Sequence, residues 1–341
     1  MDHDEFNIVC HIEIGEKKYV KQSAPEDDFL NNFLGAVALD AAFRFGVIDC
    51  VSSGAALTEN KSTNILVGML QEHGVLIGPE FSPKFQRVLS DRRPILEQKL
   101  SFLIKAAADI VSEFDTLLFD LPAFMKRSNT FALFQYDQAM NTGPTAIYET
   151  RKWVKYLSAL TTSEAPYLVE ELPFAGVDSV LEVGGNAGAF AHAYLAKFSS
   201  LTATIMDLPA VCAIGEETPH ARLSFMVGDV RKPDWTAFVP EPVDAVLFKS
   251  VLHDWPDDHV DRLLLAARAR LKESGRIVIC ERGPYEATNL KFSNVANLVF
   301  APFYRTPDIY RRALKSLGCS KFEETTVDLD MTFNIVTGYF E

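Results

Sequence analysis

Cysteines, cationic residues and long apolar runs are all scarce in this sequence of 341 residues. The five cysteines are scattered and never spaced as Cys-x-x-Cys, so they indicate neither a disulfide framework nor a zinc site. No apolar run reaches the roughly 18 residues that a membrane helix needs, and the first five residues contain no basic or apolar leader pattern. We therefore expect a soluble, unprocessed protein of the reducing cytoplasm.

The shortage of cations gives the chain a formal net charge of −13. Such a surface repels phosphate backbones and anionic lipid, which argues against a nucleic-acid-binding or membrane-surface protein. The remaining composition, 48% hydrophobic and 23% charged, is that of an ordinary globular protein, and the length favours two domains.

The N-terminal part has mainly helical patterns. Alternating apolar residues from Phe6 to Ile14, followed by a polar turn and Tyr19-Val20, predict a hairpin. Apolar positions between residues 26 and 51 recur with helical spacing and predict one helix with a buried stripe. A helix from Ser62 to Glu72 and a short wing from Gly74 to Ser82 indicate a winged helix. Because the basic recognition face is missing, a scaffold role is favoured over DNA binding.

Residues 94–172 are also mostly helical in pattern and carry a cluster of phenylalanines between Phe102 and Phe134. Core packing explains each of them, but the cluster could also wall a flat, apolar substrate. After residue 172, short apolar runs alternate with helical segments, which predicts a parallel sheet of βαβ units with an antiparallel edge at the end of the chain. The expected strands are Ser179–Val183, Thr202–Met206, Leu223–Val227, Val243–Phe248, Arg276–Cys280, Lys321–Val327 and Thr332–Tyr339.

A glycine-rich turn, Gly184-Gly185-Asn186-Ala187-Gly188, follows the first of these strands. Glycines allow positive φ and close approach of the backbone to a ligand, and the helix after the turn offers free N–H groups. Asp207 ends the next strand, where a carboxylate can accept hydrogen bonds from both hydroxyls of a ribose. The pattern predicts a ribose-bearing ligand, although a purely structural turn would use the same glycines.

Charge near this turn favours one ribose-bearing ligand. The Glu182 carboxylate precedes the glycines, where it would repel a pyrophosphate and attract an ammonium group. S-adenosylmethionine, which combines an amino-acid end, a sulfonium cation and an adenosine, therefore fits better than NAD. In the next segment, Gly228-Asp229-Val230, Asp229 either reaches the adenine amino group or closes an Asx turn.

A histidine follows the fourth strand. Ligands of open α/β sheets lie beyond the carboxyl ends of the strands, so the topology brings His253 to the mouth of the site. Its neutral imidazole could accept a proton near pH 7, while an ordinary buried histidine is the alternative. Asp254 is either a ligand-binding residue or the N-cap of a helix that begins with Pro256.

Together these motifs resemble the dimeric S-adenosylmethionine-dependent methyltransferases of plant phenylpropanoid and bacterial antibiotic pathways, over nearly the whole chain. The His253-to-Asp258 segment is the specific part of the resemblance. The resemblance implies that His253 deprotonates the acceptor and that Glu281 orients the histidine, although Glu281 could instead form a plain salt bridge. It implies a cofactor site that comprises Glu182, Gly184, Gly185, Gly188, Asp207, Leu208, Gly228, Asp229, Val230, Lys249 and Trp255.

The sequence departs from the family pattern where a second acidic residue usually braces the histidine, because Tyr304 stands there. This departure weakens the prediction that the protein methylates a phenol oxygen. The alternative is C-methylation of a small acid such as a 2-oxo acid. No histidine follows His259, so we predict no metal. Lys126, Arg127 and Arg305 could bind an acidic group, but exposed charges would look the same. The expected substrate pocket comprises Phe134, Met140, Phe300, Tyr304, Arg305 and Arg127.

We therefore expect a helical dimerisation domain with the winged helix over residues 1–170, and a Rossmann-like class I methyltransferase domain over residues 171–341. The expected protein is a cytoplasmic homodimer that binds neither nucleic acid nor membrane. It would methylate a small aromatic secondary metabolite, with oxygen favoured over carbon. A non-methylating catalyst that binds S-adenosylmethionine and a ligand-sensing regulator are the alternatives of other classes.

Overall fold

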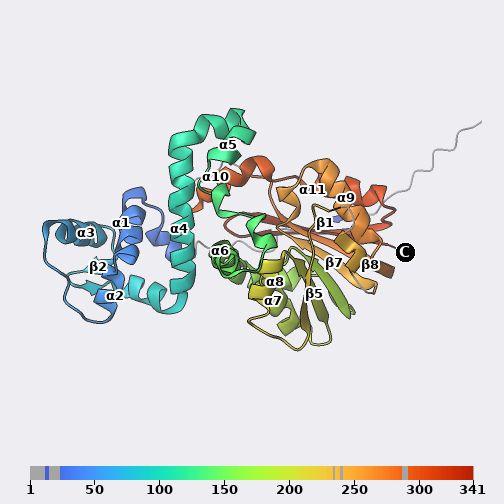
Figure 1. Cartoon of the computed structure of the whole chain (residues 1–341), viewed down its shortest axis with the longest axis horizontal. Coiled ribbons are helices and arrows are strands. Elements are labelled where there is room, and N and C mark those ends of the chain that lie inside the picture. Colours follow the sequence, from blue (N-terminus) through green and yellow to red (C-terminus); the bar gives the residue numbers. More distant parts are fainter. Residues whose placement is uncertain (1–11, 15–23, 233–234, 239–240, 286–290, 341) are drawn as a thin grey trace, which may run out of the picture.

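The computed structural model describes residues 12–14, 24–232, 235–238, 241–285 and 291–340 (Figure 1). A helical region comes first along the chain, and a mixed sheet with helices on both faces follows it. The long helix α4 runs along the boundary between the two (Figure 1). This arrangement confirms the expected α/β fold with a helical N-terminal part.

The first helices differ from the single helix expected over residues 26–51. A 3-10 turn, Pro25–Phe29, precedes α1 (Phe33–Arg44), and α2 (Val47–Ser52) follows after Gly46, whose φ of 72° ends the first helix. The single-helix prediction was therefore wrong, because a left-handed residue cannot continue a right-handed helix. The prediction that the apolar stripe is buried was wrong in part, because Phe33 and Phe45 are 49% and 76% exposed.

The helix α3 (Lys61–Glu72) and a small antiparallel pair, β2 (Leu76–Ile77) and β3 (Glu80–Phe81), lie where the winged helix was expected. The identification of this segment as a winged helix stays a prediction. This region also contains the long helices α4 (Pro83–Phe119) and α6 (Pro144–Leu168) and the short helix α5 (Leu121–Arg127).

The sheet has the strand order β1-β9-β10-β8-β7-β4-β5-β6. Strands β4 to β8 are mutually parallel, while β10 is antiparallel to both of its neighbours. This confirms the predicted parallel sheet and its antiparallel C-terminal strands. The strands are β4 (Ser179–Val183), β5 (Thr202–Asp207), β6 (Leu223–Val227), β7 (Val243–Lys249), β8 (Leu271–Arg282), β9 (Lys321–Asp328) and β10 (Thr332–Tyr339).

The expected N-terminal hairpin lies largely outside the described residues. Its described part, β1 (Ile12–Ile14), pairs in parallel with β9, so a third strand covers the edge that the last two strands were expected to form. None of the described helices is both long and apolar enough to cross a membrane. The four described cysteines are free.

Helices cover both faces of the sheet. On one face, α9 (Asp257–Arg268) and α11 (Pro307–Ser316) pack on residues of β7 and β8. On the other face, α6 and α7 (Ala189–Lys197) pack on side chains of β4, β7 and β8 that alternate with the first set. The short helices of this half are α8 (Pro209–Gly215) and α10 (Ala296–Phe300).

Two adjacent leucines of α9 test this packing. Leu264 is fully buried, whereas Leu265 is 59% exposed. We expect Leu264→Ala to lower the free energy of unfolding by about 2–5 kcal/mol, because it removes buried methyl groups and leaves a cavity. Leu265→Ala should change it by no more than about 0.5 kcal/mol. Urea unfolding followed by circular dichroism measures both, and equal losses would contradict the orientation of α9.

Candidate functional site

A cavity of about 460 Å³ lies where the carboxyl ends of the parallel strands meet the helices. Gly184 follows β4, Asp207 ends β5, Ser250 follows β7 and Arg282 ends β8, and all four residues line it. The helices α4, α6 and α10 supply the other walls, so the site lies between the helical region and the sheet. This is the edge at which open α/β folds bind their ligands.

The turn after β4 has the conformation that its glycines predict. Gly184 and Gly188 have φ of 68° and 85°, and Asn186 between them has φ of 55°. A Cβ on Gly184 would come within 2.7 Å of the Val251 side chain, so the turn packs closely against the segment that carries His253. The side-chain amide nitrogen (Nδ2) of Asn186 is buried on the cavity wall without a hydrogen-bond partner among the described residues. An unpaired buried donor on a cavity wall can bind a polar ligand.

Asp207 lies beside this turn on the cavity wall. One carboxylate oxygen accepts a 2.8 Å hydrogen bond from the Asn186 backbone N–H, and the other accepts a 2.7 Å bond from that of Leu208. Burial raises the pKa of Asp207 to about 6, while these two hydrogen bonds act to lower it. Each oxygen keeps a lone pair, so the carboxylate can accept further hydrogen bonds from two hydroxyl groups.

Glu182 lies beneath the turn and does not line the cavity. Its carboxyl accepts a hydrogen bond from the Tyr194 hydroxyl at 3.0 Å, and a Cβ on Gly185 would come within 2.9 Å of it. Burial raises its pKa to about 8, although the hydrogen bond from Tyr194 and the charge of Lys249 lower it. The carboxyl supports the turn from below, and its raised pKa favours the protonated form near neutral pH. A contact between Glu182 and an ammonium group of the cofactor stays a prediction.

One buried carboxylate organises the segment that carries the histidine. Glu281 accepts hydrogen bonds from the backbone N–H groups of Val251 and Leu252, both at 2.7 Å, through one oxygen. Its other oxygen lies 2.7 Å from Nδ1 of His253. The carboxylate fixes the proton on Nδ1, which leaves Nε2 as the basic nitrogen. The resemblance implied this pair, and the structure places both residues in contact.

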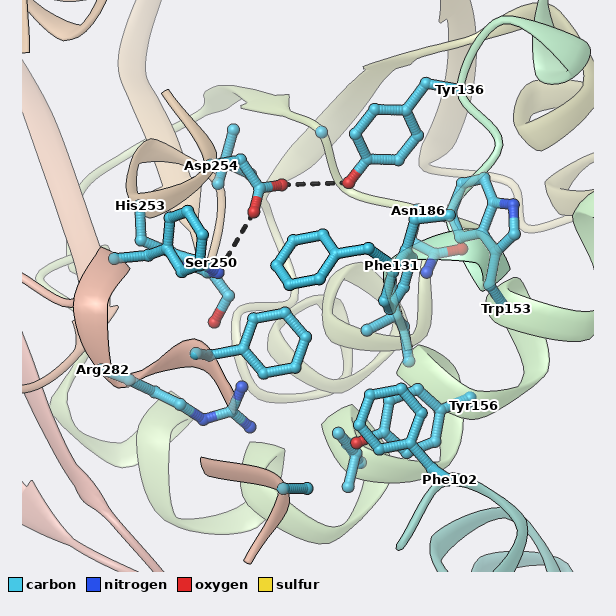
Figure 2. A pocket seen from close by; sticks show the side chains of 18 of the residues that line it. Phe102, Phe131, Tyr136, Trp153, Tyr156, Asn186, Ser250, His253, Asp254 and Arg282 are labelled. Atoms are coloured by element: carbon cyan, nitrogen blue, oxygen red, sulfur yellow. Dashed lines mark hydrogen bonds and ion pairs between the residues drawn. The ribbon is translucent and has the colours of Figure 1, made fainter. Parts of the chain in front are cut away.

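The cavity side of the imidazole has a second carboxylate. Oδ1 of Asp254 lies 3.5 Å from His253 Nε2, and Oδ2 accepts a 3.0 Å hydrogen bond from the Tyr136 hydroxyl (Figure 2). Burial lowers the pKa of His253, but the charges of Glu281 and Asp254 outweigh it, so the pKa lies above its ordinary value. Burial raises the pKa of Asp254, while the His253 charge and the Tyr136 hydrogen bond lower it.

Aromatic rings form the wall that faces the histidine. Phe102 from α4 stacks on Tyr156 from α6 with ring centroids 3.9 Å apart, and Phe300 from α10 lies parallel to Phe102 at 6.1 Å. Phe131 and Phe134 complete this wall, and the labelled rings face the cavity in Figure 2. The cavity separates these roughly parallel rings from the polar side chains at the edge of the sheet. Such an arrangement suits a flat, apolar ligand.

The other predicted residues on the wall are Leu208, Gly228, Asp229, Val230, Trp255, Phe134, Phe300 and Tyr304. Oδ1 of Asp229 accepts hydrogen bonds from the backbone N–H and the Nε–H of Arg231. Trp255 stacks on His259, with ring centroids 4.8 Å apart. The ring centroids of Tyr304 and His253 are 5.5 Å apart. A contact between any of these residues and a ligand stays a prediction.

Besides Glu182, the cavity wall does not include Gly185, Gly188, Lys249, Met140, Arg127 or Arg305. Lys249 is buried against Glu164 at 2.8 Å. Arg127 pairs with Glu113 at the surface, so its expected place in the substrate pocket is corrected. Arg305 is corrected as well, because it pairs with Asp257 and donates to the backbone carbonyls of Leu252 and Trp255.

Sequence reasoning missed most of the cavity wall. The polar residues that it missed include Tyr136, Ser250 and Arg282, and the aromatic ones Trp153 and Tyr156. Ser250 had a detectable signal, since it lies just beyond the carboxyl end of an expected strand. Its φ of 55° is strained for a residue with a side chain. Its hydroxyl is buried without a partner within the described ranges.

The fold and the cavity together define a Rossmann-like α/β protein with a ligand site at the carboxyl edge of its sheet. Residues 129–288 match the family model described as an O-methyltransferase domain, which confirms the resemblance expressed by the motifs. The matched segment contains the glycine turn, Asp207, His253 and Glu281.

Curated relatives agree with this family match. The chain is 27% identical over 175 residues to 3-hydroxy-5-methyl-1-naphthoate 3-O-methyltransferase of Streptomyces sahachiroi, which covers 48% of this chain and 50% of that protein. It is 30% identical over 139 residues to trans-resveratrol di-O-methyltransferase of Vitis vinifera, with 38% of this chain and 37% of that protein covered. The alignments thus span half or less of these relatives.

Solved structures share the fold over nearly the whole chain. Human N-acetylserotonin methyltransferase in complex with SAM superposes with a TM-score of 0.68 and 18% identity, covering 92% of this chain and 96% of that one. Mitomycin 7-O-methyltransferase superposes with a TM-score of 0.66 and 18% identity, covering 89% and 94%. These comparisons confirm the class I methyltransferase fold.

The raised pKa of Glu182 predicts a pH-dependent stability. Its carboxyl binds a proton more tightly in the folded protein than in the unfolded chain, where its pKa is 4.5. This contribution to stability is complete below pH 4.5 and is lost as pH rises through about 8. Relative to Glu182→Gln, the wild-type free energy of unfolding should therefore fall between pH 5 and 8, by at most about 1.4 kcal/mol per pH unit.

Urea unfolding of both proteins at pH 5, 6, 7 and 8 measures this difference. The variant Glu59→Gln, which changes an exposed carboxyl, is the matched control and should follow the wild-type curve. A constant difference between wild type and Glu182→Gln across these pH values would show that Glu182 is charged in the folded protein.

Proposed function

We propose that this protein transfers a methyl group from S-adenosylmethionine to an oxygen atom of a small, flat, aromatic metabolite. The observation that carries this proposal is the His253–Glu281 pair, whose histidine lies on the wall of a cavity that is also lined by Gly184 and Asp207. The family match and the named activities of the relatives support it, since both relatives described above methylate aromatic compounds.

The residues of the cavity fit S-adenosylmethionine. The unpaired Asn186 amide and Ser250 hydroxyl are donors toward a polar ligand, and Asp207 has free lone pairs for both ribose hydroxyls. We propose that Gly184 lies against the amino-acid end, and that Leu208, Asp229 and Val230 surround the adenine. When bound, the cofactor supplies a methyl group on a sulfonium centre.

The residues of this chain would align and deprotonate the acceptor. The aromatic wall of Phe102, Tyr156 and Phe300 holds a planar ring with its hydroxyl toward His253. Nε2 of His253 accepts the hydroxyl proton, and the carboxylates of Glu281 and Asp254 stabilise the imidazolium that forms. Alignment contributes up to about 7–11 kcal/mol, and a general base contributes about 10²–10⁴-fold.

The position of Asp254 bears on the choice between oxygen and carbon as the acceptor. In the sequence, Tyr304 stands where the family pattern has a second acidic residue, and this weakened the prediction of O-methylation. Asp254, held by Tyr136, supplies a second carboxylate beside the imidazole. Because a charged brace on both sides of the ring favours proton uptake, the geometry supports an acceptor with an O–H group.

We propose in addition that residues 1–170 and 171–341 form two domains and that the chain functions as a homodimer through the helical part. Exposed apolar side chains gather on this part, which supports a contact with a second copy. They include Phe33, Leu34 and Phe45 of the first helices and Val111, Phe114, Leu118 and Phe119 near the end of α4.

Removal of the base tests the proposed function. We expect His253→Ala to lower turnover by about two to four orders of magnitude, because the acceptor hydroxyl then keeps its proton. Binding of S-adenosylhomocysteine, measured by calorimetry, should remain near wild type. Asp207→Asn, in contrast, should bind S-adenosylhomocysteine more weakly than the wild type. Mass spectrometry of hydroxyarenes that gain 14 Da in the presence of S-adenosylmethionine measures the turnover, and unchanged turnover in His253→Ala would refute the base.

The charge of Glu281 should also be visible in the pH profile. A general base must be neutral, so the rate should rise with pH through an inflection above 6.5, the ordinary pKa of histidine. In Glu281→Gln the carboxylate charge is lost, so the inflection should move to lower pH and turnover should fall by about 10²-fold or more. An unmoved inflection would mean that another group controls the rate.

A further inference from the structure

Three charged side chains are buried together beside the cavity. Glu164 of α6, which is 3% exposed, forms ion pairs with both Lys249 of β7 and Arg282 of β8. Lys249 also donates to the Thr161 hydroxyl at 3.1 Å and lies off the cavity wall. Two cations thus share one carboxylate, and the group keeps a net positive charge in a part of the protein from which water is largely excluded.

Arg282 is the member of this group that reaches the cavity. Its side chain is 12% exposed, its guanidinium lies 4.8 Å from the centre of the Phe333 ring, and its residue lines the cavity. Its Nε–H has no hydrogen-bond partner within the described part of the chain. A buried guanidinium with an unused donor is costly unless an acceptor binds it.

The other charged residues on the wall do not use this donor. Asp330 is near enough for its charge to raise the pKa of Arg282, but it is exposed and forms no ion pair with it in the described structure. Lys99 is paired with Glu26 at 3.1 Å and with Asp27 at 3.3 Å. The guanidinium therefore stays available to a ligand.

The location of Arg282 separates it from the glycine turn. In Figure 2, Arg282 lies on the side of His253, whereas Asn186 lies on the opposite side, with aromatic rings between them. A planar ring held between these aromatic residues, with its hydroxyl at His253, would carry a second substituent to Arg282. This side of the cavity belongs to the acceptor half of the site.

We propose that Arg282 binds a carboxylate of the acceptor, so that the substrate is a hydroxylated aromatic acid. The inference rests on the proposed function for the identity of the acceptor half. A guanidinium matches the planar carboxylate through two parallel N–H groups, which a lysine cannot do. The expectation of an acid-binding cation in this chain is thereby transferred from Arg127 and Arg305, which are engaged elsewhere, to Arg282.

A pair of inert probes tests this proposal without any turnover. 1-Naphthoate and its neutral isostere 1-naphthamide differ only in the charged group, and calorimetry in saturating S-adenosylhomocysteine measures the affinity of each. We expect the wild type to bind the acid about 10- to 100-fold more tightly than the amide. Arg282→Gln should abolish this preference, and Arg282→Lys should retain part of it.

The controls separate the possible roles of Arg282. Arg127→Gln removes an exposed arginine and should leave the preference unchanged. Affinity for S-adenosylhomocysteine in Arg282→Gln should equal that of the wild type; if it falls together with the acid preference, the carboxylate that Arg282 binds is that of the cofactor and the proposal is wrong. Equal wild-type affinity for the acid and the amide also overturns it.

These outcomes do not depend on methyl transfer. If the acid binds through Arg282 but no hydroxylated aromatic acid gains a methyl group, the proposed function fails while the carboxylate site stands. If Arg282→Lys is folded, as shown by cooperative thermal unfolding, but shows no acid preference above that of Arg282→Gln, the charge of this residue is not what selects the acid.

Discussion

The Glu281 carboxylate is the constraint on which the geometry of the site depends. It binds two consecutive backbone N–H groups and the imidazole of His253, so one buried side chain fixes three successive residues. The register of the sheet makes this possible, because Lys249 of β7 is paired with Cys280 of β8 and both strands end at the same edge. The positive φ of Ser250 then turns the chain across the end of β8. The orientation of the imidazole is therefore a product of strand register.

The sheet and the position of His253 could be predicted from the sequence because their signals are local, whereas the pairing of His253 with Glu281 was implied only by the resemblance to the methyltransferase family. Runs of apolar residues between turns gave the bounds of β4, β6 and β10, and the residues after each strand indicated the site, since parallel strands end together. The helical region was harder. The apolar residues between 26 and 51 keep a helical spacing throughout, which concealed the break at Gly46. The left-handed backbone of this one residue ends the helix despite that spacing.

The remaining wall of the site depends on tertiary packing that no short motif encodes. Phe102, Tyr156 and Phe300 are far apart in sequence and meet only because α4, α6 and α10 converge above the sheet edge. The cations illustrate the same limit. Arg305 looks free in the sequence but donates to the backbone carbonyls of Leu252 and Trp255. The alternation of side chains along β8 did contain a clue to Arg282. Because successive side chains of a strand point to opposite faces, Arg282 must leave β8 on the face opposite to Glu281.

Unsatisfied polar atoms give a further view of the cavity. Four of its wall residues carry a buried nitrogen or oxygen without a partner in the described structure: Asn186, Ser250, Arg282 and Trp153. An unpaired buried polar atom costs about 1–3 kcal/mol, so a ligand that pairs with one of these four atoms recovers that cost as affinity. These four atoms therefore line one continuous cavity that runs from the glycine turn to the end of β8.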